Sequence, residues 1–89
     1  MMNNDPFIKI LPKIDVHGYT SDTVIFLVSD FINDNIKLGK EKIVVIHGVG
    51  EGILKKTIHR EFKKDKRVKD LYLYNMNLGI TIIELNMLE

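Results

Sequence analysis

Apolar residues recur along the chain with two different periods, and these periods predict its first elements. Between residues 13 and 18, Ile14 and Val16 alternate with polar residues, which is typical of a strand with two unlike faces. From residue 21 the apolar positions follow helical spacing, and Thr20 is a suitable N-cap. We therefore expect a strand followed by a helix that spans about residues 21–38.

The second half of the chain repeats this order and then changes to strands alone. An apolar run in the stretch 43–54 leads into His47 and a glycine-rich turn, which predicts a buried strand. Helical spacing resumes from about residue 53 to residue 64. Two further runs, 68–74 and 80–85, are separated by five turn-forming residues, and we expect them to form a hairpin.

The predicted order is β-α-β-α-β-β, which indicates an α/β fold of the two-layer α+β sandwich type. We expect a four-stranded mixed sheet with two helices on one face, and parallel first strands joined by a right-handed crossover. Residues 14–89 then form a single domain, and residues 1–13 form an N-terminal arm that packs on the sheet.

We predict that the N-terminal arm covers an apolar face of the sheet. If His47 points to the sheet face away from the helices, Ile43 and Val45 point there too, and an open apolar face is costly. Pro12 favours an extended arm over a helical one. We expect its apolar cluster to cover this face: Phe7, Ile8, Ile10 and Leu11. A second subunit is the alternative, so we expect a monomer or a weak homo-oligomer.

Composition narrows the class of protein. The chain has 89 residues, of which 45% are hydrophobic and 28% charged, as in ordinary globular domains. It has no cysteine, so disulfides and thiolate metal sites are excluded. No apolar run is long enough to span a membrane, and the N-terminus lacks the features of a signal peptide. We therefore expect a cytoplasmic protein with no membrane partner.

Charge is segregated although the net charge is only +1. The stretch 55–69 carries +6 and the rest of the chain carries −5. Such segregation favours a polyanionic partner, although a basic helix face is also commonly just a solvated surface. The residues expected to attract a phosphate backbone are Lys55, Lys56, Arg60 and Lys63. We assign His59, which lies among them, no catalytic part.

The candidate chemistry lies at the ends of the first two strands. If these strands are neighbours, Asp15, His17 and His47 converge. Histidines ordinarily titrate near pH ~6.5 and suit acid–base catalysis, and an ionised Asp15 suits the orientation of an imidazole. Alternatively, Asp15 and a histidine hold a divalent metal such as Mg²⁺. A plain turn formed by Asp15 and His17 is the structural alternative.

The glycine-rich loop is the candidate phosphate site. Gly48, Gly50 and Gly52 precede a predicted helix, whose free backbone amides suit a phosphate. The same glycines also suit a tight turn that only connects the strand to the helix and has no further role. Tyr72 and Tyr74 suit base stacking, but alternate strand positions favour packing.

Three motifs together resemble one family. The segments 14–18 (IDVHG), 46–50 (IHGVG) and 79–85 (GITIIEL) are similar in order and spacing to the Smr domain, the small MutS-related module. This resemblance implies a domain that acts on nucleic acid, often as a DNA-nicking or RNA-cleaving endonuclease, and some larger members are linked to ribosomes. It implies functional roles for the first-motif and second-motif residues: Asp15, His17, His47, Gly48 and Gly50.

Our first hypothesis is a nucleic-acid-binding endonuclease that acts on DNA or RNA through Asp15, His17 and His47. The second is a non-catalytic DNA- or RNA-binding module, which includes a ribosome-associated one. The third is a phosphate-ligand or protein-interaction domain on the same scaffold, since a fold does not fix a function.

Overall fold

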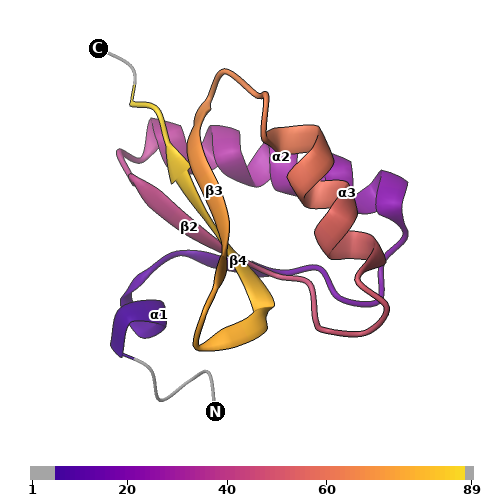
Figure 1. Ribbon diagram of the computed structural model, residues 1–89. Helices are drawn as coiled ribbons and strands as arrows, with labels where there is room; N and C mark the ends of the chain where they lie inside the picture. The colour runs from indigo at the N-terminus through magenta and orange to yellow at the C-terminus, as the bar shows by residue number, and fades with distance from the viewer. Residues whose placement is uncertain (1–5, 88–89) are drawn as a thin grey trace.

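The computed structural model describes residues 6–87 and contains seven elements (Figure 1). In chain order they are α1 (Pro6–Ile10), β1 (Lys13–Asp15), α2 (Ser21–Lys37), β2 (Lys42–Ile46), α3 (Ile53–Phe62), β3 (Val68–Tyr74) and β4 (Asn77–Leu85). From β1 onward this is the predicted β-α-β-α-β-β order. The helix α1 is an addition to it.

The strands form the predicted four-stranded mixed sheet, in the order β1-β2-β4-β3. Strand β1 is parallel to β2, whereas β4 is antiparallel to both β2 and β3. The parallel pair places Asp15 beside Ile46, so β1 and β2 end at the same edge of the sheet. This edge is where the candidate chemistry was predicted.

Helices α2 and α3 cover one face of the sheet, as expected (Figure 1). Helix α2 begins after Thr20, whose hydroxyl accepts a hydrogen bond from the Thr23 backbone N–H, and it ends before Gly39, which has a positive φ. The buried core between the helices and the sheet consists of Val16, Val24, Val28, Ile32, Ile43, Val45, Ile58, Phe62, Val68, Ile83 and Leu85.

The expectation that Ile43 and Val45 face away from the helices is wrong, because both belong to this core. Strand β2 is apolar on both faces. The alternation of side chains shows which of its residues share a face, but not which of the two faces packs against the helices. Val44 faces the other way and clusters with Ile80 and Ile82.

Helix α1 lies against that second face. Ile8 is buried against Val44, Ile80 and Ile82, and Leu11 packs at the margin of this cluster. The prediction that the arm is extended is wrong: residues 6–10 form a short helix, which Pro6 starts and Pro12 follows. Ile10, which was expected to help cover the face, is exposed.

The hairpin has a shorter turn than expected, because β4 already begins at Asn77. Tyr72 and Tyr74 are half-buried on the α1 face, in line with the packing interpretation. The Tyr72 hydroxyl donates to Glu84 over 2.8 Å, and burial together with this bond raises the pKa of Tyr72 to about 12. The Tyr74 ring stacks on Phe7 at 5.7 Å between centroids.

Within residues 6–87, no helix combines the length and the apolar character that crossing a membrane requires.

Candidate functional site

Asp15 and His17 form a close pair where β1 ends. The Asp15 carboxylate accepts a hydrogen bond from the His17 backbone N–H over 3.1 Å, which makes a tight turn. The same carboxylate oxygen lies 2.5 Å from His17 Nδ1. The turn between Asp15 and His17, which the sequence analysis gave as a purely structural alternative, is therefore present. The same carboxylate also holds the imidazole of His17.

This pair is open to solvent, with side-chain exposures of 69% for His17 and 51% for Asp15. The hydrogen bond from the His17 ring, aided by the backbone bond and by the charge of the imidazole, holds the pKa of Asp15 below its usual value. Asp15 is thus ionised near neutral pH and fixes Nδ1 of His17. The opposite ring nitrogen, Nε2, is directed away from the carboxylate.

His47 lies in a different environment, and the predicted meeting of three side chains is wrong. Asp15 shares the α1 face with its neighbour Ile46, whereas His47 is one residue further on and belongs to the helix face. Its ring nitrogens lie 2.8 Å from the Gly48 carbonyl oxygen and 2.8 Å from Thr81 Oγ1. Only 5% of His47 is exposed.

Thr81 and His59 complete this second cluster, and sequence reasoning missed both. The Thr81 hydroxyl is fully buried in β4 and also lies 2.8 Å from His59 Nε2. One signal existed for Thr81: it is the polar residue among the apolar inward positions of its strand. His59 gave none, because it stands in a run of exposed basic residues.

Both rings of this cluster favour the neutral state. Burial lowers the pKa of His47, and the charge of Lys55 lowers it further. Burial also lowers the pKa of His59, with additional effects from His47, Lys55 and Lys63. His47 is therefore a neutral, doubly bonded ring at neutral pH, whereas His17 is an exposed ring on a carboxylate.

The glycine loop lies between the two clusters. Together with the first residues of α3, it lines a pocket of about 230 Å³ that extends from His47 to Lys55. Gly48 and Gly52 have φ values of 81° and 79°, which other residues rarely adopt. Gly52 is the N-cap of α3 and its N-terminal amides receive no side-chain cap, so they remain suited to an anion.

A close backbone contact holds this loop in place. The Gly79 carbonyl accepts hydrogen bonds from the N–H groups of His47 and Gly48, each over 3.0 Å. A Cβ atom on Gly79 would lie 3.3 Å from Gly48 Cα, so Gly79 permits this approach. A Cβ atom added to Gly48 would lie 3.6 Å from the Cβ atom of His17. The exposed His17 is therefore adjacent to the loop.

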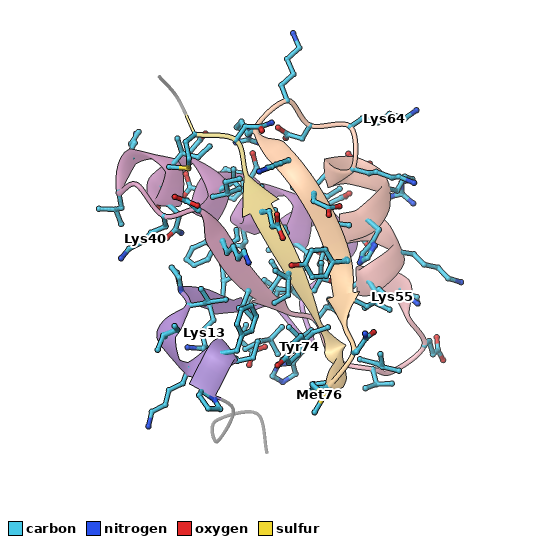
Figure 2. The ribbon with its side chains drawn as sticks, turned by 60° about the vertical axis from the view of Figure 1, so that its left-hand side comes forward. Lys13, Lys40, Lys55, Lys64, Tyr74 and Met76 are labelled. Carbon is cyan, nitrogen blue, oxygen red and sulfur yellow. The ribbon has the colours of Figure 1, made fainter. Side chains whose placement is uncertain are left out.

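The predicted basic residues lie on α3 or directly after it, and they vary in availability. Lys55 borders the pocket and is partly buried, while Lys56, Arg60 and Lys63 are exposed. Arg60 also contacts Glu61 at 3.4 Å. Figure 2 shows Lys55 and Lys64 on the α3 side of the molecule and Lys13 and Lys40 on the opposite side.

Arg67, within the same basic stretch, has a structural task. It donates to Asp65 and reaches the Ser29 carbonyl and Asn33 on α2. This ion pair lowers the pKa of Asp65 and raises that of Arg67. The positive charge that this stretch can offer to a ligand is therefore smaller than the net charge counted from its sequence.

In the part of the chain that the structure describes, no group of three or more histidine, cysteine or acidic side chains is arranged to hold a metal ion. Asp15 is the one carboxylate beside the exposed imidazole. The expectation of a divalent metal such as Mg²⁺ stays a prediction.

Comparisons with known proteins place these features in a family. The chain is 32% identical over 80 residues to Endonuclease MutS2 of Pelotomaculum thermopropionicum and 36% identical over 76 residues to Endonuclease MutS2 of Caldicellulosiruptor saccharolyticus. These matches cover 86% and 82% of this chain but only 10% of each relative. The chain thus spans about a tenth of the length of these relatives.

A solved structure has the same fold. The Smr domain of Thermus thermophilus MutS2 superposes with a TM-score of 0.83 at 24% sequence identity, covering 85% of this chain and 99% of that one. The profile of the Smr domain family matches residues 14–86, from the second residue of β1 to just beyond the end of β4. On this match and on the relatives above, the chain belongs to the Smr domain family.

Proposed function

We propose that this domain binds a nucleic acid at the edge where β1 and β2 end and cleaves its phosphodiester backbone through His17. The observation that carries the proposal is the exposed imidazole of His17, which is held at Nδ1 by an ionised Asp15 and lies next to the glycine loop. The relatives named Endonuclease MutS2 support the same reaction class.

The parts of the site suit separate tasks in this reaction. The amides that begin α3 and the exposed lysines attract the phosphate, and the glycines, which have no side chains, permit a close approach. His17 Nε2 accepts a proton from the attacking hydroxyl, which is water or, in RNA, a ribose 2′-hydroxyl. The new O–P bond forms as the bond to the leaving oxygen breaks, and Asp15 stabilises the resulting imidazolium.

The leaving oxygen must then gain a proton. His47 was the expected acid, but its two ring nitrogens are engaged and burial favours its neutral form. In the proposed mechanism the imidazolium of His17 or a water molecule supplies that proton. His47 holds the loop and takes no part in proton transfer.

A purified protein provides the test. Supercoiled plasmid and single-stranded RNA are incubated with the wild type, with His17→Ala and with Lys40→Ala, an exposed control on the far side of the molecule (Figure 2). Cleavage by the wild type and Lys40→Ala but not by His17→Ala supports the proposal. Undiminished cleavage by His17→Ala contradicts it, and parallel reactions with a chelator reveal any need for a divalent metal.

A non-catalytic binding module is the second candidate. It is favoured by the separation of the two histidine clusters, which leaves His17 without a second exposed imidazole beside it. Binding that weakens steeply with salt, with all substrates left intact, is the outcome expected for this candidate.

A further inference from the structure

His47, Thr81 and His59 form a hydrogen-bonded chain whose proton positions follow from the partners. A carbonyl oxygen only accepts, so His47 Nδ1 must donate to Gly48 O. In a neutral ring the other nitrogen is then a bare acceptor, and the Thr81 hydroxyl must donate its single proton to His47 Nε2. His59 Nε2 therefore donates to Thr81 Oγ1.

This chain connects three elements that enclose the glycine loop. His47 follows β2, Thr81 lies in β4 and His59 lies in α3, so the hydrogen bonds join the first residue of the loop to the helix that follows the loop through a buried hydroxyl. Its terminal acceptor, the Gly48 carbonyl, belongs to the wall of the pocket. Buried polar chains of this kind fix one geometry, because every reversal leaves a donor or acceptor without a partner.

We propose that Thr81 and His59 are positioning residues, which hold the Nδ1–H tautomer of the His47 ring in place and thereby fix the Gly48 end of the anion-binding loop. The inference about the tautomer follows from the hydrogen-bond geometry together with the neutral state of the buried His47 ring. Only its consequence for ligand binding rests on the proposed function.

The tautomers are directly measurable. Long-range ¹H–¹⁵N spectra of the labelled protein near neutral pH should show the proton of His47 on Nδ1 and that of His59 on Nε2. His17, whose Nδ1 meets a carboxylate, provides an internal reference of the Nδ1–H type. A His47 ring with its proton on Nε2 overturns the inference.

Two variants separate positioning from simple packing. Thr81→Val keeps the shape and removes the hydroxyl, whereas Thr81→Ser keeps the hydroxyl and loses a methyl group. We expect the hydrogen bond to His47 Nε2, which the ¹⁵N shift of that nitrogen reports, to be preserved in Thr81→Ser and lost in Thr81→Val, while the Gly48 carbonyl keeps the proton on Nδ1. His59→Gln, which retains a donor, should also preserve it better than His59→Leu does.

Binding is measured by fluorescence anisotropy with labelled single-stranded RNA and DNA. Thr81→Val should bind roughly three- to tenfold more weakly, the range expected for one lost hydrogen bond, and Thr81→Ser should bind as the wild type does. Equal affinity of Thr81→Val and the wild type overturns the positioning role. If the wild type binds neither strand, the proposed function fails while the spectra still decide the tautomer.

Discussion

The two histidines that follow the parallel strands lie on either side of Gly48 but differ in every property that matters for chemistry. His17 is exposed and contacts through one nitrogen the carboxylate of Asp15, which lies on the α1 face. His47 is buried, has both nitrogens bonded and lies on the helix face. Neighbouring positions at one sheet edge thus give one ring suited to proton transfer and one suited to holding backbone.

Among changes that leave both histidines in place, removing the carboxylate should have the largest effect. Asp15→Asn retains a similar shape but loses the charge that orients the His17 ring and stabilises its cation, and we expect roughly 10²- to 10⁴-fold slower cleavage. The measurement is the single-turnover rate with the preferred substrate. A rate within a factor of about three of the wild type would show that Asp15 serves only the turn.

The next largest effect should be on the stability of the fold, and it should differ between variants of His47 and of His17. His47→Ala removes two buried hydrogen bonds and leaves a cavity, so we expect it to lower the free energy of unfolding by roughly 2–4 kcal/mol. His17→Ala, the matched exposed variant, should change it by less than about 0.5 kcal/mol. Urea denaturation checks both values, and equal losses would contradict the contrast.

A smaller effect should appear in the dependence of stability on pH. Burial lowers the pKa of His47 and His59, so the unfolded chain binds protons more readily than the folded one. The stability gained from their neutral forms is present above the ordinary value near ~6.5 and is lost as the pH falls below it.

Thermal melts are recorded in a His17→Gln background, in which His47 and His59 are the remaining histidines. We expect Tm to fall by roughly 2–5 °C between about pH 7.5 and about pH 5.5. The further change His59→Gln should flatten this dependence. A Tm that stays constant or rises toward acid in the first variant is the contrary result.

The smallest effect concerns the basic surface. Lys63→Ala removes an exposed charge of the α3 side, so the slope of log affinity against log salt should become shallower by about one. Lys40→Ala, on the opposite side, should leave the slope unchanged. Equal changes in the two variants would indicate diffuse attraction with no preferred face.

The sequence predicted most of the fold because its apolar periods were unambiguous from residue 14 onward. The order of elements, the mixed sheet and the placement of both long helices on one face all follow from those periods and from the crossover rule. The helix α1 was missed because five residues are too few for a period to be read. Its position depends on the burial of Ile8.

The site was only partly predictable. Asp15 and His17 were paired correctly from their spacing, although β1 ends at Asp15 and the turn after it holds His17. His47 was placed on the wrong face because β2 is apolar on both sides, and only tertiary contacts with Thr81 and His59 decide its orientation. Those contacts join residues from three elements, which local patterns do not report.

Chemical rescue tests the central claim most directly, namely that His17 and not His47 carries the proton. His17→Ala leaves an exposed space beside Asp15, and added imidazole should restore cleavage there in a concentration-dependent way. His47→Ala loses a buried ring that held backbone, and imidazole should restore nothing. Rescue of His47→Ala, with none of His17→Ala, would contradict the account.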